Sequence, residues 1–182
     1  YNKDVNGFPK VERPIENRYE LNEHLANLFE SAMETLDKKL SYARYQAIAY
    51  LKPEAANGLY DNAELISRSL AGIRKNGLVK RLESSFYAFQ ISLNNFRQAN
   101  QNMIDMFNRD KVFIAPDLDI NNLLEAGLSD EEIEEKLNAK AEENPKNSVF
   151  KAEDFDSEYF DLLQQDQEIH EKLYKEREGI SD

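Results

Sequence analysis

Cysteine is absent from this chain of 182 residues. Without it the protein has no disulfide framework and no thiolate metal site, which fits a reducing compartment. No apolar run approaches the roughly 18 residues that a membrane span needs, and no basic start is followed by the apolar stretch of a signal peptide. We therefore expect a cytoplasmic protein that does not interact with a membrane.

Histidine is nearly absent as well, since only His24 and His170 occur. A di-iron helical bundle needs the pattern Glu-x-x-His twice. The residues three before the two histidines are Leu21 and Gln167, so the pattern is missing, and we expect both histidines on exposed helix faces without a metal. Without cysteine or a Gly-x-Ser-x-Gly motif, nucleophilic catalysis has no local signature either.

A nucleotide-binding motif is also missing. Gly72 and Gly77 have the glycine spacing of a phosphate loop, but Leu78-Val79 follow where the loop needs lysine and then serine or threonine. The acidic run at 130–133 has no preceding apolar strand to place its carboxylates at a sheet edge. We expect neither ATP hydrolysis nor a tightly held metal in the isolated chain, and no catalytic residue or cofactor of its own.

What the chain does contain is an amphipathic composition. Apolar residues make up 41% and charged residues 32%, and the mean hydropathy is -0.74. A chain of this length can bury about 70% of its unfolded surface in one domain. With so many charges, the core must be a stripe along amphipathic elements. This composition favours an all-α fold.

The charge is divided unequally along the chain. Residues 1–100 carry 14 basic and 12 acidic residues, whereas residues 101–182 carry 9 and 23. Between Leu65 and Leu82 no acid occurs, and the basic residues there are Arg68, Arg74, Lys75, Lys80 and Arg81. Composition alone leaves two interpretations open, a patch that meets phosphates and a solvated helix face.

The spacing of apolar residues predicts two helices before residue 77. The first begins at about Tyr19 and runs to residue 40, and its period continues past Ser41 towards Pro53. The second begins at a capping box of Asp61 and Glu64 and ends at a left-handed stop at Asn76-Gly77. Its apolar positions are Leu65, Ile66, Leu70 and Ile73.

The longest predicted element covers residues 78–108, where an apolar stripe runs without proline or glycine. At 1.5 Å per residue it is about 45 Å long. We expect it to pack antiparallel to the 19–40 helix and to bury Leu82, Phe89, Leu93 and Phe96. Tyr87 lies off this stripe, within one or two turns of Lys80 and Arg81, which makes it the aromatic most available for stacking on a base.

Shorter elements follow. Residues 111–116 form a connector, either a short strand or a tucked loop, and residues 120–125 a short helix ended by Gly127. Ser129 and Glu132 form a capping box that opens an acidic helix with little to bury, and a last helix runs from about Phe155 to Arg177. The prediction is an irregular helical bundle built on one long central helix, with a peripheral acidic helix. We divide it into a linker at 1–18, a helical core at 19–110, the connector and acidic helix at 111–153, and a C-terminal helix at 154–182.

Three stretches resemble bacterial SNF2-type ATP-dependent helicases of superfamily 2, in the helical segment between their two RecA-like motor lobes. The most distinctive is Lys80-Arg81-Leu82-Glu83-Ser84-Ser85 with Tyr87-Ala88-Phe89. The others are the tyrosine-rich 42–53 segment and the 154–169 segment, and together they span most of residues 40–175.

The resemblance implies a non-catalytic helical insert that spaces the lobes and contacts the nucleic-acid backbone, DNA or RNA. ATP and magnesium would be bound by the flanking lobes of the parent protein. The implied nucleic-acid-binding residues are Arg74, Lys75, Lys80, Arg81 and Tyr87, with the four cations converging around Asn76-Gly77, where a helix N-terminus would add its positive dipole.

Two alternatives stay open. The chain could be a freestanding acidic all-helical adaptor or scaffold that binds a protein through an exposed apolar helix face. Arg81 could instead pair with Glu83 or Glu64 and only tie two helices together. Because the chain begins at Tyr1 and residues 1–18 lack a helical period, we expect it to be cut from a longer protein, with residues 1–18 leaving a preceding lobe and residue 182 leading to the next.

Overall fold

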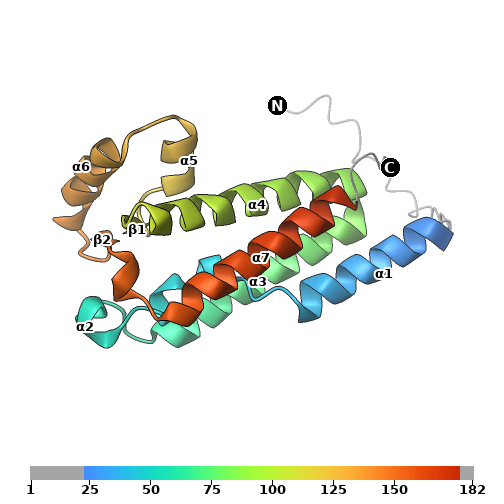
Figure 1. Cartoon of the computed structure of the whole chain (residues 1–182), viewed down its shortest axis with the longest axis horizontal. Coiled ribbons are helices and arrows are strands. Elements are labelled where there is room, and N and C mark those ends of the chain that lie inside the picture. Colours follow the sequence, from blue (N-terminus) through green and yellow to red (C-terminus); the bar gives the residue numbers. More distant parts are fainter. Residues whose placement is uncertain (1–22, 177–182) are drawn as a thin grey trace, which may run out of the picture.

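The computed structural model describes residues 23–176 (Figure 1). Helices dominate this part of the chain, which confirms the all-α class predicted from the sequence. In chain order the elements are α1 (Glu23–Lys38), the 3-10 helix η1 (Ala43–Ala49), α2 (Pro53–Ala56), α3 (Ala63–Ser84), α4 (Phe86–Asn108), β1 (Val112–Ile114), α5 (Ile120–Glu125), α6 (Asp130–Ala141), β2 (Ser148–Phe150), the 3-10 helix η2 (Ala152–Asp154) and α7 (Ser157–Lys175).

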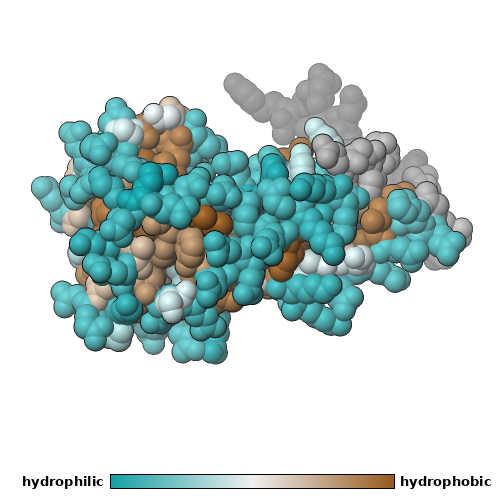
Figure 2. Space-filling model, in the orientation of Figure 1, coloured by the Kyte–Doolittle hydropathy of each residue, from teal (hydrophilic) through white to brown (hydrophobic). Residues whose placement is uncertain are grey.

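Helices α1, α3, α4 and α7 lie alongside one another, and the short elements from β1 to β2 gather at one end of α4 (Figure 1). The core has two parts along this length. One joins α1, α3, the first half of α4 and the end of α7 around Leu36, Leu78 and Phe89. The other joins η1, the second half of α4, the sheet, α5, α6 and the start of α7 around Met106 and Tyr159. Figure 2 shows that hydrophilic residues cover most of one face, with apolar residues emerging between them near the end formed by α5 and α6.

The single long helix predicted for residues 78–108 is wrong, because the chain breaks at Ser85. This residue has an extended backbone, with φ -171° and ψ 130°, and its side-chain oxygen accepts a hydrogen bond from the N–H of Ala88 at 3.2 Å. Serine is a favoured N-cap, so α4 starts afresh there. The apolar stripe still looks continuous in the sequence because Leu82 before the break and Phe89 after it enter the same core.

The predicted stop at Asn76-Gly77 is also wrong. Helix α3 runs through both residues to Ser84. Its N-cap is Asn62, which has a left-handed backbone and makes no side-chain cap, so the expected Asp61–Glu64 capping box is not formed. A helix-interior glycine costs only about 1 kcal/mol relative to alanine. Packing on both sides of Gly77, through Ala71 and Leu78, outweighs that cost.

The first helix does not continue past Ser41. It ends at Lys38, and Tyr42 then takes a left-handed backbone, with φ 57°, before η1. Its predicted start at Tyr19 and the predicted linker at 1–18 lie outside the described residues. Helix α1 packs mainly on α3, and not on the element that carries Leu93 as expected. Leu82, Phe89 and Leu93 are buried as predicted, whereas Phe96 is only partly buried.

At the end of the molecule formed by residues 111–153, the structure agrees more closely with the prediction from the sequence. The connector is a strand, β1, which pairs antiparallel with β2 so that Phe113 lies opposite Val149. Ser129 and Glu132 form the predicted capping box of α6, and Ile133 and Leu137 are fully buried. Helix α7 lies within the predicted 155–177 range. Within 23–176, none of the helices combines the length and apolarity that crossing a bilayer requires.

Candidate functional site

The residues predicted to bind nucleic acid lie along α3 and at the start of α4. Arg74 and Lys75 lie in the middle of α3, Lys80 and Arg81 lie near its C-terminal end, and Tyr87 is the second residue of α4. The prediction that the four cations converge on a helix N-terminus is therefore wrong. Cations in the last turns of a helix complement the negative end of its dipole, so the dipole gives no added attraction for phosphate at Lys80 and Arg81.

Two of the four cations serve the fold. The guanidinium of Arg74 lies 5.1 Å from the centre of the Tyr45 ring, a cation–π contact that ties α3 to η1. Lys75 Nζ lies 2.5 Å from Asp37 Oδ1 and so ties α3 to α1. This contact holds the pKa of the Asp37 carboxyl below its usual value. Arg74 and Lys75 are therefore occupied by neighbours in the same chain.

Lys80 and Arg81 are exposed and have no ion-pair partner among residues 23–176. The alternative pairing of Arg81 with Glu64 is not formed, because Glu64 pairs with Arg68, four residues along the same helix. Tyr87 exposes 65% of its surface. Of the five predicted residues, Arg74 is exposed as well but stacks on Tyr45, and Lys75 is half-buried beside Asp37.

The most distinctive surface is an apolar one that the sequence pattern did not locate. We call it the α3 outer face, and it consists of Leu65, Ile66, Leu70 and Ile73, which expose 67%, 41%, 41% and 64% of their surface. The buried residues of the helix are Ser67, Leu78 and Leu82. The sequence identifies the four residues of this face as the apolar positions of the predicted helix, without assignment to a buried or an exposed side. The overlooked signal is that Ile66, Leu70 and Ile73 lie roughly a third to a half of a turn away from the line through Leu78 and Leu82.

His170 is buried, with 4% exposed, which contradicts the prediction that it decorates an exposed face. Neither of its ring nitrogens has a hydrogen-bond partner in the part of the chain that the structure describes. Burial, opposed by the nearby charge of Glu171, lowers the pKa of His170 to about 4. The edge of the ring meets Phe96 at 6.4 Å between centroids, so His170 acts as a neutral core side chain.

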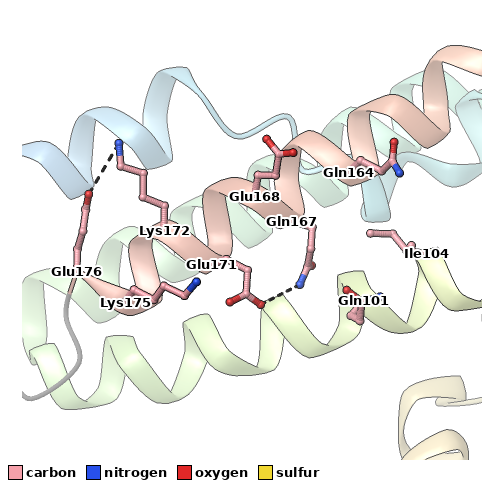
Figure 3. A pocket seen from close by; sticks show the side chains of 9 residues that line it. All are labelled: Gln101, Ile104, Gln164, Gln167, Glu168, Glu171, Lys172, Lys175 and Glu176. Atoms are coloured by element: carbon pink, nitrogen blue, oxygen red, sulfur yellow. Dashed lines mark hydrogen bonds and ion pairs between the residues drawn. The ribbon is translucent and has the colours of Figure 1, made fainter.

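A groove runs between α4 and α7 (Figure 3). Most of the residues that line it are of polar type, among them Gln101 from α4 and Gln167, Glu171 and Lys172 from α7, although much of the surface they present is that of their apolar carbons. The Glu171 carboxylate is held by both of its oxygens, each 3.1 Å from Arg97 Nη1, and Arg97 also stacks on Tyr174. These side chains bind one another and tie α7 to α4.

Within residues 23–176, no group of three or more acidic or histidine side chains is arranged to hold a metal ion. Among the described residues, the α3 outer face and the exposed cations Lys80 and Arg81 are accessible to another molecule. A comparison with protein-family models, curated proteins and solved structures found no match to this chain.

Proposed function

We propose that this chain is a non-catalytic helical insert between the two RecA-like motor lobes of an SNF2-type ATP-dependent helicase or translocase. In that role it spaces the lobes and contacts the nucleic-acid backbone, while ATP and magnesium are bound by the lobes themselves. The parent protein is then an ATP hydrolase of the cytoplasm, and the partners of the insert are the flanking lobes and DNA or RNA.

The observation that carries this proposal is the two-sided character of the 80–89 segment, where the resemblance is most distinctive. Leu82, Phe86 and Phe89 are buried in the core that joins α1, α3, α4 and α7, so this half of the segment explains the fold. Lys80, Arg81, Glu83 and Tyr87 are exposed. No packing within residues 23–176 requires the residues of the exposed half. We expect a half of this kind in a segment that also contacts a neighbouring molecule or domain.

The bundle also has the mechanical properties of a spacer. Helices α3 and α4 contain 22 and 23 residues, and α7 packs along α4 through a cluster that includes the Arg97–Glu171 pair. Long packed helices hold their ends at a fixed separation because interiors packed at crystal density resist compression.

The test belongs in the intact parent helicase. Changing Lys80 and Arg81 together to Ala should weaken nucleic-acid binding and lower the stimulated rate of ATP hydrolysis. The slope of log affinity against log salt should fall by about 0.7–0.9 for each phosphate that the variant no longer neutralises. The matched control changes the exposed residues Lys136 and Lys146 to Ala and should alter neither quantity. An unchanged affinity and salt slope in the double variant would remove nucleic-acid binding from the proposal.

The alternative is a freestanding acidic helical adaptor, which the α3 outer face also supports because it is apolar and exposed. The genomic reading frame distinguishes the two. The insert requires motor motifs in the same frame before residue 1 and after residue 182, and a frame that contains neither motif would replace the insert with the adaptor.

A further inference from the structure

The α3 outer face has the geometry of a helix–helix seam. Ile66, Leu70, Ile73 and Gly77 follow one another at steps of four, three and four residues, which places them on one line along the helix. The three apolar members are between 41% and 64% exposed. The line faces away from the buried side of α3, so nothing in the described core requires it to be apolar.

Gly77 strengthens this interpretation. It lies in the interior of α3, where glycine disfavours the helix, yet a Cβ built there would meet no described atom within 4 Å. The packing of the described residues therefore gives no reason for glycine at position 77. A bare backbone at the end of an apolar line allows the backbone of a second helix to approach closely.

The charges beside the line select the partner. Between Leu65 and Leu82 the chain has five basic residues and no acid. Of these, Lys80 and Arg81 lie one turn beyond Gly77, beside the line, and have no ion pair among the described residues, whereas Arg68 pairs with Glu64. Two copies of this face would bring like charges together, whereas an acidic helix would be attracted and oriented.

We propose that the α3 outer face binds an acidic amphipathic helix of a partner protein, which lays its apolar side along Ile66, Leu70, Ile73 and Gly77 and sets its carboxylates against Lys80 and Arg81. This is the mode in which an amphipathic helix presents anchors at i, i+3, i+4 and i+7 to an apolar surface. Lys80 and Arg81 serve both proposals, but the apolar line is not used by the insert function, so the peptide experiments and the nucleic-acid experiment can fail independently.

The probe is a labelled synthetic helix of about three heptads, with leucine at the a and d positions and glutamate on the flanks. Fluorescence anisotropy with the full 182-residue chain should show saturable binding. A second peptide with lysine in place of every glutamate should bind at least about tenfold more weakly, which corresponds to about 1.4 kcal/mol. Equal binding of the two peptides would overturn the charge selection, and with it the proposal.

Variants then locate the site. Leu70→Glu with Ile73→Glu should weaken binding of the acidic peptide at least about tenfold. Ile91→Glu introduces the same charge at an exposed apolar position of α4, 48% exposed, and should leave the affinity unchanged. Lys80→Glu with Arg81→Glu should weaken binding of the acidic peptide and strengthen binding of the basic peptide. All of these positions are exposed, and circular dichroism checks that each variant is folded. An unchanged affinity in the Leu70 and Ile73 double variant would contradict the proposal.

Sedimentation of the chain without peptide tests a second copy as the occupant. We expect a monomer. A dimer that the Leu70→Glu and Ile73→Glu changes abolish would assign the face to self-association and overturn the acidic-helix proposal.

Discussion

Asp166 of α7 accepts a hydrogen bond from the backbone N–H of Ala43 at 2.8 Å, although 123 positions of the sequence separate them. The same carboxylate accepts bonds from the backbone N–H of Ser41 at 2.8 Å and from its hydroxyl at 2.9 Å. Between these donors Tyr42 takes its left-handed backbone. Asp166 therefore satisfies the polar groups that become free where α1 ends and η1 begins.

The first prediction concerns this carboxylate. Asp166→Ala leaves the N–H groups of Ser41 and Ala43 without their acceptor, and each buried unsatisfied group costs on the order of 1–3 kcal/mol, so we expect the free energy of unfolding to fall by about 3 kcal/mol. Urea denaturation measures it. Asp161→Ala removes an exposed carboxylate of the same helix and should change the stability by less than about 0.5 kcal/mol. Equal effects of the two substitutions would contradict the role of Asp166.

The second prediction concerns His170. Its pKa of about 4 in the folded protein lies below the ordinary value of 6.5, so the unfolded chain binds the proton more tightly. The stabilising effect of neutral His170 is fully present above about pH 6.5 and is lost as the pH falls towards 4, which amounts to about 3 kcal/mol. His170→Leu should remove that part of the pH dependence in denaturation curves recorded between about pH 4 and 7.

The control for His170 is the other histidine. His24 is exposed, so His24→Gln should change the free energy of unfolding by less than about 0.5 kcal/mol. If His170→Leu shows the same loss of stability between pH 6.5 and about 4 as the unchanged chain, groups other than His170 cause it.

The third prediction compares two glycines. Gly77→Ala places a methyl group in open space within α3, and because alanine is the better helix former it should raise the free energy of unfolding by about 1 kcal/mol. Gly58 instead has φ +72°, so Gly58→Ala should lower it by roughly 1–2 kcal/mol. The thermal unfolding midpoints of the two variants should shift in opposite directions, upwards for Gly77→Ala and downwards for Gly58→Ala. A destabilised Gly77→Ala variant would contradict the continuous α3.

The fourth prediction compares two buried tyrosines. The Tyr42 hydroxyl donates a hydrogen bond to the carbonyl oxygen of Leu36 at 2.9 Å, whereas the fully buried Tyr159 hydroxyl has no partner within residues 23–176. Removing a satisfied buried hydrogen bond costs about 1 kcal/mol, and removing an unsatisfied hydroxyl costs nothing or stabilises the fold. In chemical denaturation, the free energy of unfolding of Tyr159→Phe should therefore equal or exceed that of the unchanged chain, and that of Tyr42→Phe should be lower. The reverse order would refute the assignment.

Local patterns predicted the elements whose two ends and one face are all encoded nearby. The α6 helix is an example, because the Ser129–Glu132 box sets its start and Ile133 and Leu137 mark its buried side within a few residues. Prediction from local patterns failed where two different structures have the same spacing of apolar residues. A stripe through Leu82 and Phe89 fits one long helix as well as two helices that meet at Ser85. The extended backbone of Ser85 and the hydrogen bond from the Ala88 N–H to its side chain distinguish the two structures.

The candidate surface shows the same limit. The five cations between Leu65 and Leu82 are visible in the sequence, but their convergence on a helix N-terminus depended on a stop at Gly77 that the helix does not make. Tyr45 and Asp37, from distant parts of the chain, contact Arg74 and Lys75 and so decide that these two cations have partners within the fold.

The sequence by itself determined the helical class, the lack of a phosphate-loop motif and of a Gly-x-Ser-x-Gly motif, and most residues that enter the core, because these depend on composition, on short motifs and on periods of three and four residues. The tertiary structure alone decided that Tyr42 turns the chain, that His170 is buried and that Ile73 is exposed. Each of these depends on a partner far away in the sequence or on the lack of one within the described residues, and a local pattern does not contain that information.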